Sequence, residues 1–124
     1  MAERKIKITV GPCEVTAELD RSATSDLVWS ALPIESAADI WGDEIYFRTD
    51  IRAEEDASQF IVDLGDIGYW PPGQALCLFF GPTPASQGDE IRPASPVNVV
   101  GKIEGDSTVL KRVSAGNRVM VEKV

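Results

Sequence analysis

The sequence predicts a mainly β protein, built as a closed barrel or a sandwich. Three observations lead to this prediction: several short segments alternate apolar and polar residues, turn-forming residues separate them, and little of the chain has helical spacing. The 124 residues, 44% of them hydrophobic, match the size and composition of one folded domain. We therefore expect residues 1–124 to form a single domain.

Alternating segments locate the strands, and turn residues separate them. Gly11-Pro12 predicts a hairpin turn after the first strand. Pro71-Pro72-Gly73 predicts a type II turn in which Gly73 supplies the positive φ. The expected strands are Lys5–Val10, Cys13–Leu19, Glu35–Trp41, Glu44–Arg48, Ile67–Trp70, Gln74–Phe80, Val97–Ile103 and Asn117–Val124.

Short helical segments and long loops are expected between these strands. Asp20-Arg21-Ser22 supplies capping residues before a helix at Ser25–Leu32, and Pro33 ends it. We expect Trp29 of this helix to lie on the barrel. A second helical turn is expected at Thr108–Val113, and loops are expected at Thr49–Phe60, with one helical turn at most, and at Gly81–Pro96.

The charge pattern bears on partners and location. All of the net charge of −8 is carried by Glu35–Asp66, which holds ten acidic and two basic residues. Such a protein repels phosphate backbones, so we expect no nucleic-acid partner. The acidic stretch is interpreted as a solvated surface, with attraction of a cationic ligand or partner as the alternative. No signal peptide is visible and no apolar run could span a membrane, so we expect a soluble, cytoplasmic protein without a membrane partner.

Several catalytic classes have no support in the residue inventory. The chain has no histidine, which removes Ser-His-Asp and Cys-His catalysis and histidine-ligated metal sites. It also has neither a G-x-G-x-x-G nor a G-x-x-x-x-G-K-[ST] motif. The two cysteines, Cys13 and Cys77, belong to no CxxC, and we expect them to be unpaired. We therefore expect no metal and no cofactor.

Aromatic residues and prolines are concentrated in one part of the chain. Eight of the nine aromatics lie between Trp41 and Phe80, and six of the eight prolines lie between Pro71 and Pro96. An aromatic-lined depression with a few polar groups is typical of a ligand site, although such rings also fill barrel cores. In Glu44–Arg48, alternation predicts that Ile45 and Phe47 face the interior, whereas the outer row is Glu44, Tyr46 and Arg48. That row could bind a polar ligand or form a charge-paired exposed strand.

Three segments resemble a family of small archaeal and bacterial cyclophilin-like proteins. They are WGDEIYF (Trp41–Phe47), GDIGYWPPGQALCLFFGPTP (Gly65–Pro84) and PASPVNVVGKIEG (Pro93–Gly105). The resemblance extends from the first hairpin to the final strand. It implies a closed, roughly eight-stranded β-barrel with one or two short capping helices, but no activity. Cyclophilins proper isomerise X-Pro bonds with an arginine, a glutamine, aromatics and a histidine around an outer groove, and this chain lacks the histidine.

Three functional hypotheses follow from these observations. The favoured one is a non-catalytic module that binds a small molecule or an extended peptide. The first alternative is a prolyl cis-trans isomerase with a non-standard groove, in which Arg48 polarises the peptide bond. The second is a small-molecule amide enzyme or its accessory domain. The candidate ligand-binding residues of the favoured hypothesis are Glu44, Tyr46, Tyr69, Trp70, Phe80 and Thr83.

Overall fold

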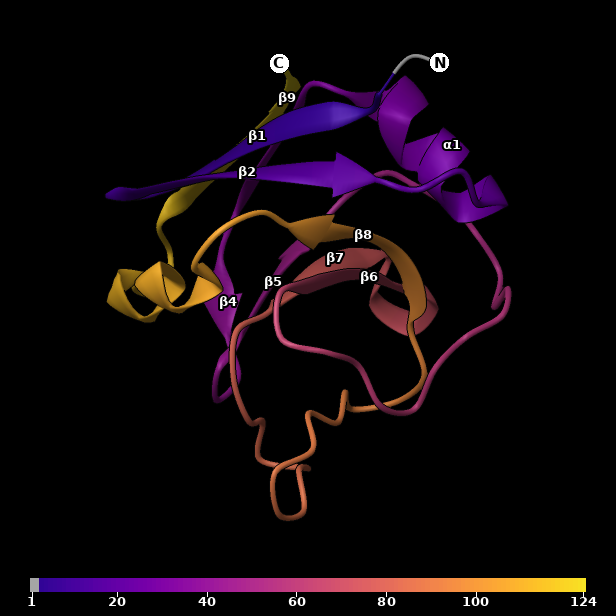
Figure 1. The fold of residues 1–124 in the computed structure, drawn as a ribbon. Coiled ribbons are helices and arrows are strands. Elements are labelled where there is room, and N and C mark those ends of the chain that lie inside the picture. The colour runs from indigo at the N-terminus through magenta and orange to yellow at the C-terminus, as the bar shows by residue number, and fades with distance from the viewer. Residues whose placement is uncertain (1–2) are drawn as a thin grey trace.

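The computed structural model describes residues 3–124, which form a nearly closed antiparallel β-barrel (Figure 1). The described sheet has nine strands in the order β3-β9-β1-β2-β8-β6-β7-β5-β4. This confirms the mainly β barrel expected from the sequence. The strands are β1 (Lys5–Val10), β2 (Cys13–Leu19), β3 (Ile34–Ala37), β4 (Asp39–Ile40), β5 (Glu44–Arg48), β6 (Asp66–Trp70), β7 (Ala75–Phe79), β8 (Asn98–Ile103) and β9 (Arg118–Lys123).

The expected strand Glu35–Trp41 is divided into two, and this division brings the two edges of the sheet together. β3 pairs with β9, whereas β4 pairs with β5. Between them, the Ala38 N–H donates to the carbonyl of Asn117 at 2.8 Å, and the Ala38 carbonyl accepts from Gly116 at 2.8 Å. One continuous segment therefore supplies both edge strands of the sheet. Counted as one strand, it gives the eight strands that the family resemblance implied.

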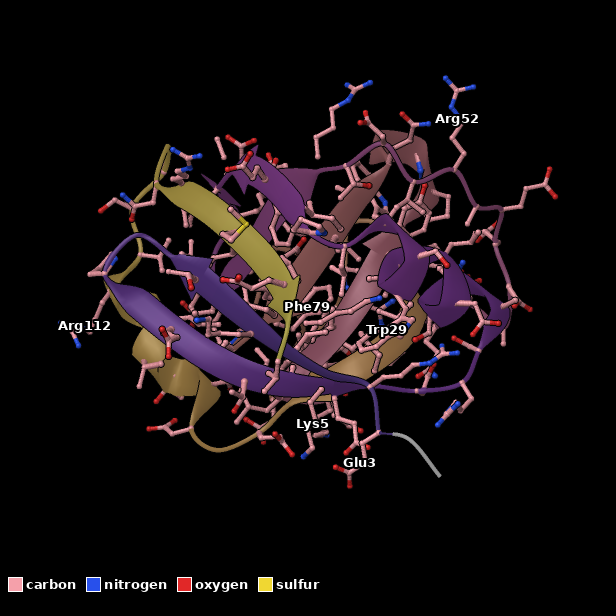
Figure 2. All side chains as sticks on the ribbon, turned by 90° about the horizontal axis from the view of Figure 1, so that it is seen from above. Glu3, Lys5, Trp29, Arg52, Phe79 and Arg112 are labelled. Atoms are coloured by element: carbon pink, nitrogen blue, oxygen red, sulfur yellow. The ribbon has the colours of Figure 1, made fainter. Side chains whose placement is uncertain are left out.

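The barrel interior is filled by one face of each alternating strand. In β1, Ile6, Ile8 and Val10 are all buried, and their neighbours in sequence are half-buried. Antiparallel pairing of β1 with β2 and β9 lines up further buried residues beside them. Charged side chains remain outside, as Arg52 and Arg112 show at opposite ends of the molecule in Figure 2. The period-2 pattern thus places the part of the main core that these strands supply.

Two helical elements pack against the barrel. Helix α1 (Ala23–Ala31) begins after Ser22, whose hydroxyl accepts a hydrogen bond from the Ser25 N–H at 3.2 Å. Trp29 of α1, labelled in Figure 2, packs against the barrel core. The Lys123 ammonium lies 4.5 Å from the centroid of its ring. The second element is a 3₁₀ helix, η2 (Ser107–Arg112). Both helical predictions are confirmed to within two residues at each end.

The predicted type II turn at Pro71-Pro72-Gly73 is wrong. These residues form a short 3₁₀ helix, η1 (Pro71–Gly73), and the positive φ of 49° falls on Gln74. Two successive prolines hold φ near the value that a 3₁₀ helix requires, so the left-handed residue is displaced to the end of the helix. Gly73 is required for another reason: a Cβ there would lie 2.6 Å from the ring of Trp70.

Two long irregular segments, 49–65 and 80–97, lie against each other on the outside of the barrel. The N–H of Gln59 donates to the carbonyl of Val97 at 2.8 Å, and that of Val62 donates to the carbonyl of Ile91 at 3.0 Å. The later segment is the long orange loop at the bottom of Figure 1. No helical turn forms within Thr49–Phe60. None of the helices among residues 3–124 has the length and apolar character needed to cross a membrane.

Candidate functional site

A second apolar cluster lies on the outer face of the strands β5, β6, β7 and β8. Its partly buried margin includes Tyr46 and Trp70. Alternation along the strands separates it from the barrel core, and the loops over this face shield it from water. Phe79, labelled in Figure 2, is its largest fully buried member. The buried residues of the cluster are Val62, Cys77, Phe79, Ile91 and Val97.

A hollow of about 270 Å³ lies beside this cluster. Three of its aromatic side chains, Trp41, Tyr46 and Trp70, are partly exposed, so the hollow is accessible from solvent. Its mostly apolar lining is typical of a small-molecule site, and its volume, just below the usual range, suits a small ligand. The lining residues are Trp41, Glu44, Tyr46, Trp70, Cys77, Pro93, Ala94 and Val97.

Strand register brings the polar residues of the hollow together. In the β5–β7 pair, Tyr46 lies opposite Cys77, and Cys77 lies opposite Gly68 in the β7–β6 pair. A Cβ on Gly68 would lie 2.8 Å from Val97 Cγ2. Because Gly68 has no side chain, Val97 can pack directly onto the sheet next to Cys77.

A tight turn places Trp41 beside Glu44. The two residues exchange backbone hydrogen bonds of 2.9 and 3.1 Å across Gly42-Asp43. Gly42 has a φ of 61°, and a Cβ there would lie 2.7 Å from Pro84 Cδ. The Asp43 N–H donates to the carbonyl of Pro82 at 2.9 Å, which ties the turn to the beginning of the long loop. Main-chain hydrogen bonds therefore hold the turn that carries Trp41 and Glu44 against the long loop.

Glu44 is the most unusual residue in the hollow. Its side chain is buried, with 6% of the residue exposed, and its Oε1 atom has no hydrogen-bond partner among the described residues. Burial raises the pKa of Glu44 to about 7, and a contact with the Cys77 thiol opposes this change. Since a buried polar atom without a partner costs free energy, a ligand that supplies the missing hydrogen bond gains affinity.

The other titratable groups of the hollow are held in their neutral forms. Burial raises the pKa of Cys77 well above its ordinary value, and the carboxyl of Glu44 adds to the effect. Burial also raises the pKa of Tyr46, with smaller contributions from Asp39 and Glu44. Cys77 is therefore a protonated thiol rather than a nucleophilic thiolate at neutral pH. Cys13 and Cys77 are both free and buried.

Three of the six candidate residues lie together, and three lie elsewhere. Glu44, Tyr46 and Trp70 line the hollow. Tyr69 lies in the barrel core, where its hydroxyl donates to the carbonyl of Ile51 at 2.6 Å. Phe80 also belongs to the barrel core. The physical reason is alternation: Tyr69 and Trp70 are neighbours on one strand and point to opposite faces.

Thr83 has a structural position within the long loop. Its hydroxyl donates to the carbonyl of Arg92 and accepts from the Ala85 N–H at 3.2 Å, while its N–H donates to Ser86 Oγ at 2.9 Å. These bonds hold the two arms of the loop together. Thr83 does not line the hollow, but it helps to position the arm that contains Pro93 and Ala94.

Five lining residues were absent from the sequence-based candidates. Trp41 and Cys77 could have been included, because Trp41 opens the WGDEIYF motif and alternation puts Cys77 on the face opposite Leu76 and Leu78. No local signal identifies the loop residues. Their position depends on how the loop crosses the sheet. These loop-borne residues are Pro93, Ala94 and Val97.

Arg48, the cation of the isomerase hypothesis, lies outside the hollow. It is exposed at the end of β5 and borders a different depression, together with Pro33 and Thr49. Its backbone carbonyl accepts a hydrogen bond from Ser36 Oγ at 2.7 Å. Among residues 3–124 there is no group of three or more cysteines and acidic residues placed to hold a metal ion.

Comparison with known proteins places the chain in a family. Residues 4–122 match the cyclophilin-like family. The chain is also similar to the hypothetical protein AF2241 from Archaeoglobus fulgidus, known from a solution structure, with 44% identity and a TM-score of 0.84. That similarity covers 98% of this chain and 95% of the other. A search of curated proteins finds no match. The extent of the family match shows that this chain belongs to the cyclophilin-like family.

Proposed function

We propose that the protein is a non-catalytic binding module whose hollow takes a small molecule or the side chain of an extended peptide. The supporting observation is the buried Oε1 atom of Glu44, which has no partner among the described residues and lies in an aromatic-lined hollow. A separate depression of about 520 Å³, lined in part by Asp66 and Lys102, offers a contrast. There, Asp66 and Lys102 already pair with each other at 3.5 Å. The hollow around Glu44 instead presents an unsatisfied group.

Binding is favoured over covalent catalysis by the chemistry of the residues in the hollow. Nucleophilic catalysis requires a thiolate or another activated nucleophile, and Cys77 is held as a thiol. A carboxyl group with a pKa near 7 suits proton transfer. Its titratable neighbours, Cys77 and Tyr46, both have raised pKa values, so neither is an ionised partner for such a reaction at neutral pH. The hollow therefore offers one orienting group and apolar contact area, which is sufficient for binding.

The isomerase alternative receives less support because Arg48 does not line the aromatic hollow. A protease-coupled assay on a series of X-Pro tetrapeptides tests it. We expect no acceleration over the uncatalysed rate. Acceleration that is lost in Arg48→Ala would instead establish an isomerase and overturn the non-catalytic proposal.

A fragment screen tests the binding proposal. Ligands that bind only the folded state raise the unfolding temperature, so a thermal-shift screen of neutral and charged fragments should yield stabilising compounds. Their effect should be lost in Trp70→Leu and Glu44→Gln, which alter the hollow. Phe60→Ala is the matched control, because Phe60 is 65% exposed and does not line the hollow. Compounds that stabilise both hollow variants as fully as the wild type would show that the site is wrong.

A further inference from the structure

The environment of Glu44 indicates which chemical class the hollow accepts. Glu44 takes part in no ion pair among residues 3–124, although it is one of the few buried acidic residues. A buried carboxylate without a counter-ion is costly, and so it is stabilised strongly by any cation that reaches it. The cation could be a basic side chain of the protein or a group on a ligand.

Two basic side chains near the hollow, one on η2 and one on the covering loop, are already paired with other acids. Lys111 lies 3.9 Å from the carboxylate of Asp43. Arg92, on the loop that covers the hollow, lies 2.6 Å from Glu90 and forms two hydrogen bonds with it. The side chains that line the hollow include no basic residue. Among the described residues, the lining of the hollow therefore supplies no positive charge to Glu44, and the place of a counter-ion is open to a ligand.

The rest of the lining is also suited to a cation. Aromatic rings attract cations through their faces, and two indoles and one phenol line the hollow: Trp41, Trp70 and Tyr46. The surrounding segment 35–66 carries the whole net charge of the protein, so its field attracts cations rather than anions. The free Oε1 atom of Glu44 requires a hydrogen-bond donor. A protonated amine supplies both the charge and the N–H.

We propose that the hollow binds a small protonated amine with an apolar body, whose N–H group donates to Glu44 Oε1 while its apolar part lies against Trp41, Tyr46 and Trp70. This inference rests on the proposed binding function and narrows it to one ligand class. An amine on a larger molecule, such as the end of a lysine-like side chain, presents the same chemistry. A neutral donor would satisfy the hydrogen bond but leave the carboxylate without a counter-ion.

Three probes of similar shape separate charge from hydrogen bonding. They are benzylamine (a cation with N–H donors), benzyl alcohol (a neutral donor) and benzyltrimethylammonium (a cation without an N–H). Affinities are measured by calorimetry on the wild type, Glu44→Gln and Phe60→Ala, and the binding location is mapped from backbone amide chemical shifts. We expect benzylamine to bind the wild type and the Phe60→Ala control at least about tenfold more tightly than the other two probes.

The same preference should depend on Glu44 and on pH. In Glu44→Gln, benzylamine and benzyl alcohol should bind with similar affinity. In the wild type, the preference for benzylamine should grow as pH rises through about 7, because Glu44 then ionises while the amine stays protonated. The titratable neighbours of Glu44, Cys77 and Tyr46, both have raised pKa values and stay neutral in this range. This pH series uses the wild-type protein and does not depend on the folding of a variant.

The outcomes separate this inference from the proposed function. If neutral and charged probes bind equally and shift the amide signals of Tyr46 and Cys77, the hollow is a binding site and the amine inference is overturned. If benzyltrimethylammonium equals benzylamine, the required N–H contact to Glu44 is overturned. If neither these probes nor any screened fragment binds in the hollow, both proposals fail.

Discussion

The two faces of the strands β5, β6 and β7 differ in how completely their polar groups are satisfied. On the inner face, Ile45 and Phe47 are fully buried in the main core, and the one hydroxyl there, on Tyr69, is hydrogen-bonded. On the outer face, Glu44 is almost as deeply buried but has an oxygen without a partner. The same strands thus carry a core with its hydroxyl hydrogen-bonded on the inner side and a buried carboxylate with one unpaired oxygen on the outer side.

This difference separates the residues that serve folding from those that suit binding. Neither water nor a ligand reaches an inner face that is enclosed by the barrel. An unpaired polar group there would lower the stability of the fold and could not contribute to binding. An outer face covered by a loop leaves a hollow at its margin, where a missing hydrogen bond can be supplied by a ligand. The contrast between Tyr69 and Trp70, one residue apart, shows how closely the two roles are interleaved.

The largest expected effect comes from truncating matched rings on the two faces. Phe47 and Phe79 are both fully buried, one in the barrel core and one in the outer cluster. Phe47→Ala should lower the free energy of unfolding by about 3–5 kcal/mol. Phe79→Ala should cost about 1 kcal/mol less, because the covering loop can move into the space. Urea denaturation measures both, and equal losses would show that the outer cluster is as rigid as the barrel.

A somewhat smaller effect is expected from the ionisation of Glu44. Its pKa is about 7 in the folded protein and close to 4.5 in the unfolded chain. Between these values the folded state holds more protons, so stability is greatest below the lower pH and falls as pH rises through about 7. The loss should be about 3 kcal/mol, and Glu44→Gln should remove this part of the pH dependence. Denaturant midpoints across this pH range test it, and an unchanged slope in Glu44→Gln would assign the effect to another group.

Removal of the Tyr69 hydroxyl should have an intermediate effect. Tyr69→Phe leaves the carbonyl of Ile51 without its hydrogen bond and should cost about 1–3 kcal/mol. Because Tyr69 lies on the inner face of the strands, the substitution should leave probe binding in the hollow unchanged. Thermal denaturation measures the first effect and calorimetry the second. A loss of probe affinity in this folded variant would extend the site into the barrel core.

The smallest effect is expected at the Trp70 indole nitrogen. Trp70 Nε1 donates to Ser95 Oγ at 2.6 Å in a partly exposed contact. Ser95→Ala should therefore lower the free energy of unfolding by only about 1 kcal/mol, because water can replace the lost acceptor. It should weaken probe binding if this bond holds the ring at the hollow. Unchanged probe affinity would show that packing alone, including the contact with Gly73, fixes the ring.

Much of the barrel follows from local pattern. Alternation in Lys5–Val10 and Cys13–Leu19 predicts β1 and β2 with their observed bounds, and it also places Ile45 and Phe47 inside. These outcomes depend on neighbouring residues alone, since side chains one apart on a strand point to opposite faces. The same rule separates Tyr69 from Trp70, and its consistent use would have removed Tyr69 from the candidate site.

The sequence by itself determined the β class, most of the strand positions, the family resemblance and the outward position of Glu44. Only the tertiary structure decided that Glu44 is buried, because the cover comes from segments far away in the chain. Val97 and Pro93 reach the hollow through a loop that is held by contacts such as Gln59 with Val97. Long-range contacts of this kind leave no local period in the sequence. Alternation could therefore indicate which way Glu44 points, and only the folded chain could show that its carboxylate lies in a hollow with one oxygen unpaired.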